Sequence, residues 1–121
     1  MDLPLFESDE IPRPPGQVRL LALEVSPYPD RARVRVAVRL TPFLERPNLE
    51  LQVVDGEGAE RAGVSVVEAI TPELGLTLHL RGPQAPAPLR LRARLEYPEQ
   101  DASDSAEVSF DPAGPPARWA R

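Results

Sequence analysis

The sequence predicts an all-β protein, an antiparallel β-sandwich of about seven strands. Apolar and polar residues alternate most clearly over residues 31–40, where arginines interleave with alanine, valine and leucine. Alternation with a period of two residues gives a sheet one dry face and one wet face. The same pattern recurs over residues 89–95, and the remaining runs are short and bounded by Pro, Gly and Asp. No connection between residues 17 and 111 has the length and the 3.6-residue period of a helix.

A chain of 121 residues suits one domain with one core and is short for two. We expect that domain over residues 17–111. Residues 1–16 are predicted to be a flexible, acidic leader because four prolines and a glycine interrupt any regular element. Residues 112–121 are predicted to be a matching flexible, Pro-rich tail. The chain has no cysteine, so packing rather than disulfides or a thiolate-bound metal must stabilise it.

The first three strands follow from the turn residues between them. The first is expected over residues 17–26, and it ends at Pro27-Tyr28-Pro29-Asp30, where two prolines remove backbone donors. The second is expected over residues 31–41. The third is expected over residues 49–54, and it turns at Asp55-Gly56, a pair suited to the positive φ of a hairpin.

The last four strands are separated by polar segments rich in turn residues. They are expected over residues 61–70, 74–81, 89–97 and 105–110. Burying large apolar side chains contributes about 1.5 to 3 kcal/mol each, which can offset the loss of chain entropy. The alternation predicts the following inward positions: Leu21, Leu23, Val25, Val34, Val36, Val38, Leu40, Leu49, Leu51, Val53, Val64, Val66, Leu74, Leu76, Leu78, Leu80, Leu91, Ala93, Leu95, Val108 and Phe110.

With this strand count, spacing and Pro-rich first turn, residues 17–111 resemble an immunoglobulin-like or fibronectin type III-like sandwich of the kind common in bacterial proteins. The resemblance is to a fold. An antibody-type domain has a cysteine pair and a Trp on its third strand, where this chain has no cysteine and Leu51. Tyr97 ends the sixth strand rather than beginning it, so it does not correspond to a tyrosine corner. The resemblance implies a spacer or binding module.

That resemblance also assigns the charged residues to faces. The sixth strand would lie between the third and the seventh, so its arginines would pair across strands with Glu50, Gln52 and Glu107. The second strand would lie between the first and the fifth. Its outward arginines would neighbour Arg19, Thr77, His79 and Arg81 and form a basic, mostly unpaired face. We name this surface, with the residues Arg33, Arg35, Arg39 and Arg81, the arginine face.

A basic face on a chain of net charge -5 favours a partner with an acidic surface: another protein, a neighbouring domain or the leader. The alternative is a solvated face that only prevents sheets from stacking. Nucleic acid is not expected, because the net charge is negative and no exposed aromatic residue interleaves with the arginines. Trp119, flanked by Arg118 and Arg121, either anchors a partner or folds back on the domain. Phe43 and Leu44 either cap the open end of the sandwich or mark a contact patch.

Catalysis is not expected. A hydrolase triad needs a nucleophile, a base and an orienting acid, and the only histidine, His79, falls on a regular strand beside like charges. No nucleophile elbow, phosphate-binding glycine loop or His-rich metal spacing occurs. No cofactor or metal site is therefore predicted. Four acidic residues around one turn give an alternative calcium site: Glu99, Asp101, Asp104 and Glu107.

The sequence thus predicts a non-catalytic protein-interaction or spacer module. The alternatives are a carbohydrate- or calcium-binding accessory domain, and an obligate subunit that pairs through its first or seventh strand as a sheet edge. The oligomeric state stays open. The start of the chain lacks the basic and apolar runs of a secretory signal, and no segment approaches the roughly 20 apolar residues that span a bilayer. A cytoplasmic location is expected, or an exported one if the chain is part of a larger exported protein.

Overall fold

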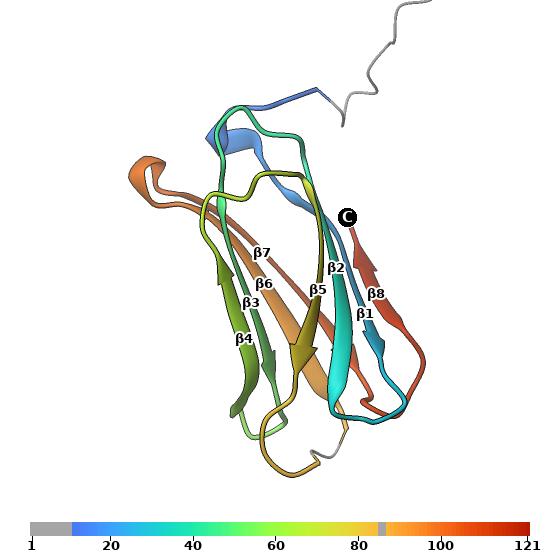
Figure 1. Cartoon of the computed structure of the whole chain (residues 1–121). Coiled ribbons are helices and arrows are strands. Elements are labelled where there is room, and N and C mark those ends of the chain that lie inside the picture. The colour runs from blue at the N-terminus through green and yellow to red at the C-terminus, as the bar shows by residue number, and fades with distance from the viewer. Residues whose placement is uncertain (1–10, 85–86) are drawn as a thin grey trace, which may run out of the picture.

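The computed structural model describes residues 11–84 and 87–121, which form two antiparallel four-stranded sheets packed face to face (Figure 1). The predicted all-β sandwich is confirmed. The strands are β1 (Leu20–Pro27), β2 (Arg33–Leu40), β3 (Asn48–Val54), β4 (Glu60–Val66), β5 (Glu73–His79), β6 (Leu89–Tyr97), β7 (Ala102–Phe110) and β8 (Ala117–Ala120), with short 3₁₀ helices η1 (Pro15–Gln17) and η2 (Pro98–Gln100). Neither helix is long or apolar enough to cross a membrane, and no other helix occurs in the described residues.

The order of the strands is β5-β2-β1-β8 in one sheet and β4-β3-β6-β7 in the other. The expected neighbours are confirmed, because β2 lies between β1 and β5, and β6 lies between β3 and β7. The seventh strand is an edge, as predicted. The first strand is not an edge, because β8 pairs with it from Ala22 opposite Ala120 to Val25 opposite Ala117.

Strand β8 corrects the prediction that residues 112–121 form a flexible tail. Residues 117–120 form a strand, and Trp119 lies opposite Leu23 and packs against the buried core. Trp119 therefore folds back on the domain, which was one of its two predicted placements. The tail was misjudged because four residues after two prolines are too few to show a period.

The core fills the space between the sheets, and every predicted inward residue except one belongs to it or packs against it. In β2 the pattern is strict, since Val34, Val36 and Val38 are at most 3% exposed. The exception is Leu21, which is only half-buried. A β-bulge between Leu20 and Ala22 shifts the register of β1, so Leu20 points inward in its place.

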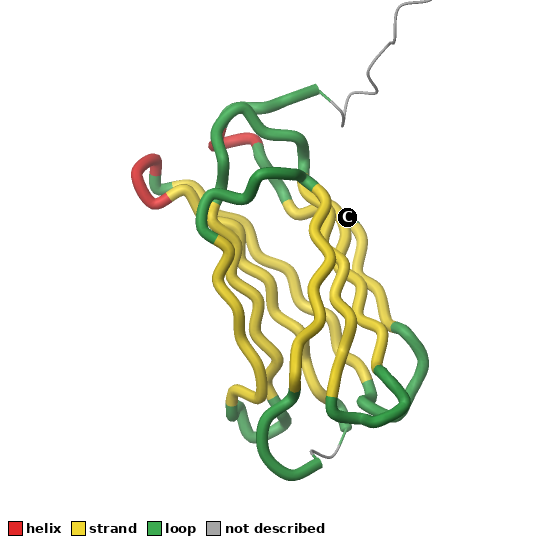
Figure 2. The backbone as a smooth tube through the Cα atoms, in the orientation of Figure 1, coloured by secondary structure: helices red, strands yellow, loops and turns green. Residues whose placement is uncertain are grey.

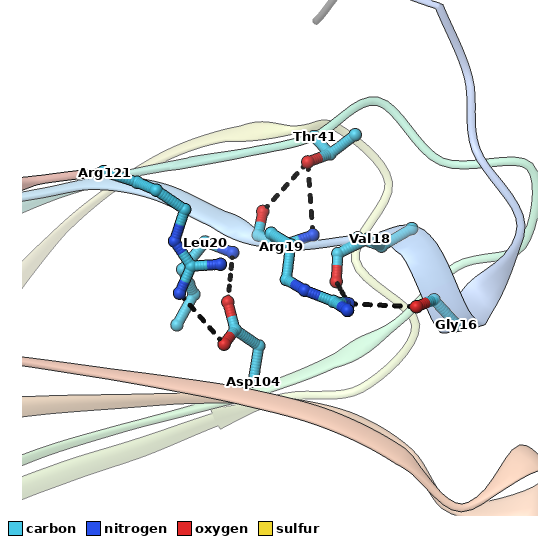
Figure 3. Close-up of polar contacts among 7 residues, drawn as sticks. All are labelled: Gly16, Val18, Arg19, Leu20, Thr41, Asp104 and Arg121. Atoms are coloured by element: carbon cyan, nitrogen blue, oxygen red, sulfur yellow. Dashed lines mark hydrogen bonds and ion pairs between the residues drawn. The ribbon is translucent and has the colours of Figure 1, made fainter.

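An acidic side chain from the opposite sheet supports this bulge (Figure 3). The backbone N–H of Leu20 donates to Oδ2 of Asp104 at 2.9 Å, and Nη2 of Arg121 donates to its Oδ1 at 3.2 Å. Nearby, Thr41 Oγ1 accepts from the Arg19 N–H at 3.1 Å. One carboxylate on β7 thus joins β1 to β7 and fixes the end of the chain.

Replacing Asp104 by alanine is expected to lower the free energy of unfolding by about 1 to 3 kcal/mol, because the Leu20 N–H beside the bulge loses its acceptor. Urea denaturation measures the change. Glu99→Ala, at an exposed carboxylate on η2, is the matched control and is expected to change stability by less than about 0.5 kcal/mol. Equal stability of the two variants would contradict this role for Asp104.

Candidate interaction surface

Three segments meet at the end of the sandwich where β1 begins (Figures 1 and 2): residues 11–17, the β2–β3 connection and the β4–β5 connection. The Arg13 N–H donates to the Pro42 carbonyl at 2.9 Å, and the Leu44 N–H donates to the Arg13 carbonyl at 3.0 Å. Short backbone hydrogen bonds therefore join the segment that precedes β1 to the β2–β3 connection.

The β4–β5 connection is attached to the same structure. The Ala69 N–H donates to the Pro47 carbonyl at 2.8 Å, and the Glu68 N–H donates to Oδ1 of Asn48 at 2.9 Å. Pro47 and Ala69 are themselves buried. Because these bonds fix the backbone, the side chains between them are presented at defined positions.

This end of the sandwich gathers exposed apolar side chains. Ile11 is 49% exposed, Leu44 67%, Val67 72% and Ile70 77%, and within the described residues these are the large hydrophobic side chains that are exposed. Single exposed apolar residues are common on protein surfaces, but four of them on joined segments at one end of a domain indicate a contact surface. We name these four residues the apolar end.

The two predicted roles of the β2–β3 connection are divided between neighbouring residues. Phe43 is half-buried and packs against the core, so it caps the open end of the sandwich. Leu44 faces solvent and belongs to the apolar end. Sequence reasoning missed Val67 and Ile70 because the fourth strand was expected to continue to residue 70. The adjacent valines at 66 and 67, which break the alternation, were the available signal.

Polar groups border the apolar end. A shallow hollow of about 210 Å³ beside Val67 is lined by Asn48, Glu50, Arg94 and Glu96 among others. Arg94 and Glu96 form an ion pair at 3.0 Å. An apolar centre with a polar border is the usual anatomy of a protein–protein contact.

Below the surface, Tyr97 secures the β2–β3 connection. Its hydroxyl donates to the Glu45 carbonyl at 2.6 Å, and burial, reinforced by the Glu45 charge, raises the pKa of Tyr97 to about 12. The neutral phenol is the form that this site favours. The stability that the neutral Tyr97 hydroxyl contributes is complete when the pH is below the ordinary pKa of 10.0. It is lost as the pH rises through the folded-state pKa.

Tyr97→Phe is expected to lower the free energy of unfolding at neutral pH by about 0.5 to 1.5 kcal/mol, since one hydrogen bond is lost. Between pH 10 and about 12 the unchanged chain should then lose stability faster than the variant. Denaturant unfolding at several alkaline pH values tests both statements. A variant with an unchanged slope would show that Tyr97 is not the group responsible.

The arginine face is less basic than predicted. Arg33 lies opposite His79, and Arg35 opposite Thr77, as expected. However, Arg33 forms an ion pair with Asp30 at 2.8 Å and lies over the ring of Tyr28. The Ala32 N–H and the Arg33 guanidinium hold the pKa of Asp30 below its ordinary value. The prediction of a mostly unpaired face is therefore wrong at Arg33.

Other predicted members of that face point elsewhere or meet acidic residues. Arg39 lies opposite Glu73 in the register. Arg81 forms an ion pair at 3.7 Å with Glu60 of the other sheet. The Arg19 guanidinium donates to the carbonyls of residues 16 and 18 at 3.0 Å (Figure 3). The Arg35 guanidinium lies over Gly75 of the neighbouring strand β5.

The opposite sheet has the predicted pairing of β6 arginines with Glu107, whereas Arg94 forms its ion pair with Glu96 and not with Glu50 opposite it. Arg92 lies between Gln52 and Glu107 and forms an ion pair with Glu107 at 2.9 Å. Arg90 reaches the same carboxylate at 3.6 Å. His79 is an exposed residue on β5, as expected.

The predicted acidic cluster does not form. Asp104 points inward to Leu20 and Arg121, whereas Glu107 faces outward to the arginines of β6. Throughout residues 11–84 and 87–121, no group of three or more His, Cys, Asp or Glu side chains is placed to hold a metal ion. The calcium hypothesis loses the geometry on which it depended.

At the far end of the molecule, Arg61 lines a cavity of about 270 Å³. Its guanidinium binds Asp55 at 2.9 Å and the Arg81 and Pro83 carbonyls at 3.0 and 2.6 Å. The Ala59 N–H, followed by Arg61, lowers the pKa of Asp55. These groups hold the β3–β4 turn, and the cavity is also lined by Asp30, Arg31 and Asp111.

No protein-family model matches the sequence, and no curated protein does. Among solved structures, the chain is similar to part of the β-glucuronidase of Bifidobacterium dentium, determined with coumarin-3-O-glucuronide. The TM-score is 0.53 at 19% sequence identity, and the match covers 80% of this chain but 18% of the enzyme. The chain thus spans less than a fifth of that enzyme's length. At this identity the likeness supports one conclusion, that the chain has the fold of a small β-sandwich.

Proposed function

We propose that the chain is a non-catalytic protein-interaction module with an immunoglobulin-like or fibronectin type III-like topology. Its strand order supports this type, since β1, β2 and β5 share one sheet while β3, β6 and β7 share the other. That is the arrangement the sequence resemblance implied. Small sandwiches of this type serve as binding modules in many unrelated proteins.

The observation that carries the proposal is the apolar end. Its exposed side chains come from three segments that backbone hydrogen bonds join, so little ordering of the surface is required on binding. The partner is another protein or a neighbouring domain that offers an apolar patch. The sequence-based proposal of an acidic partner for Arg33, Arg35 and Arg39 remains as a second candidate, because the three residues share one sheet face.

Replacing Leu44, Val67 and Ile70 together by serine is expected to abolish partner binding while changing the free energy of unfolding by less than about 1 kcal/mol, since all three are exposed. Retention of binding proteins from a cell lysate, followed by affinity measurement with the purified partner, tests this. A loss of affinity of at least about tenfold is expected, because three apolar side chains that the partner would bury are replaced by polar ones.

Arg33→Glu with Arg35→Glu is the matched variant on the other surface. It is expected to bind as the unchanged chain does. If charge reversal abolishes binding and the serine variant does not, the contact lies on the arginine face and the proposal for the apolar end is wrong.

A further inference from the structure

Strand β7 presents a long, regular and unoccupied sheet edge. Its nine residues pair with β6 without a register shift, from Tyr97 opposite Ala102 to Leu89 opposite Phe110. Within the described residues, no other strand pairs with β7. The strand contains no proline, glycine or bulge, which are the usual devices that prevent edge pairing.

The outer face of the sheet is hollowed next to this edge. A groove of about 650 Å³ lies over β3, β6 and β7 and is lined by Glu50, Gln52, Arg92, Arg94, Glu107 and Trp119 among others. Strand β8 passes close to β7 but pairs with β1. The side chains along the outer face of β7 are small apart from Glu107, so another strand can approach closely.

The other three edges are less suited to pairing. Strand β8 has four residues. Strand β4 has a register shift where it meets β3, and its Arg61 carbonyl already accepts from the Arg81 N–H. Strand β5 contains Gly75, whose outer side is covered by Arg35.

The inward carboxylate of Asp104 does not prevent pairing at β7. An inward charge on an edge strand normally blocks a second strand, because its desolvation is costly. Here the carboxylate is already bound by the Leu20 N–H and by Arg121.

We propose that β7 pairs antiparallel with β7 of a second copy of the chain, around a two-fold axis at Ala106. In this register Ser105 faces the partner's Glu107, and Asp104 faces the partner's Val108. All nine residues of the strand find a partner, and no carboxylate faces another. The β4-β3-β6-β7 sheets of the two copies then form one continuous sheet of eight strands. The interface is isologous, as a two-fold dimer requires.

Neighbouring registers fit less well. Centring the axis on Asp104 or on Glu107 places two identical carboxylates opposite each other, which is destabilising. A one-residue shift relative to the proposed pairing would set inward side chains against outward ones. Centring on Ser105 avoids like charges but pairs seven residues in place of nine.

The test is the sedimentation of purified full-length chain over a range of concentrations. The unchanged chain is expected to show a monomer–dimer equilibrium. In the proposed dimer, Ser105→Glu sets a glutamate opposite Glu107 of the other copy at two places. The dissociation constant should therefore rise about 2- to 30-fold. Ser105→Lys sets lysine against glutamate and should keep the dimer or strengthen it. Because Ser105 lies opposite Arg94 within the chain, the glutamate variant is expected to fold.

Ser65→Glu, at an exposed serine on β4 at the other edge of the same sheet, is the matched control and should leave the dimer unchanged. The proposal is overturned if the unchanged chain is monomeric at all concentrations, or if lysine and glutamate at Ser105 weaken the dimer equally. It is also overturned if the serine variant of the apolar end, rather than Ser105→Glu, dissociates the dimer. The β7 edge and the apolar end are separate surfaces, so either proposal can fail without the other.

Discussion

A carboxylate at Val36 is expected to leave the domain unfolded. Val36 is fully buried in β2, between Val25 of β1 and Leu76 of β5. An unpaired charge there costs several kcal/mol, and the lost apolar contacts add to that cost. The total stability of a domain this size is about 5 to 15 kcal/mol, so Val36→Asp removes most or all of it.

The fluorescence of Trp119, the only Trp in the chain, reports this unfolding, because the indole packs against the core. Arg35→Asp is the control one residue away, at an exposed position on the other face of the strand, and is expected to change stability by less than about 0.5 kcal/mol. A cooperative melt of Val36→Asp near that of the unchanged chain would mean that β2 is not buried as described.

Ending the chain at Pro116 is expected to be the second most damaging change. It removes the β1–β8 ladder, the packing of Trp119 on the core and the contact of Arg121 with Asp104. Removing a large core aromatic costs about 3 to 5 kcal/mol, and a loss on that order is expected here, since the ladder is lost with the half-buried ring.

Urea denaturation of the shortened chain measures this loss, and Arg118→Ala, at an exposed position on β8, provides the control for a change in the same strand. If the shortened chain is as stable as the unchanged one, β8 contributes nothing to the domain and the tail behaves as the sequence predicted.

The sequence predicted those strands in which apolar and polar residues alternate over many positions. Strand β6 was predicted with its observed bounds, and the neighbours of β2 and β6 followed from the fold resemblance. Strand β8 was missed because it has four residues, and the bulge in β1 was missed because both Leu20 and Leu21 are apolar. A local pattern cannot tell which of two adjacent leucines points inward.

The candidate surface was harder to predict, because it depends on contacts between distant segments. Leu44 was noted as apolar in a connection, but its gathering with Val67 and Ile70 requires the antiparallel order of the strands. The unpaired positive charge of the arginine face was overestimated for a similar reason. Asp30 is in a turn, so its ion pair with Arg33 depends on backbone geometry that alternation does not describe.

The antiparallel pairing of β8 with β1 determines how the domain responds to mechanical force. The Arg121 N–H donates to the Leu21 carbonyl at 2.9 Å, so the last residue of the chain lies beside the start of β1. Tension between these points acts along the ladder hydrogen bonds, which run perpendicular to the strands. The bonds therefore break one after another, as in a zipper. Under such a load β8 detaches from β1, and Trp119 leaves the core with it.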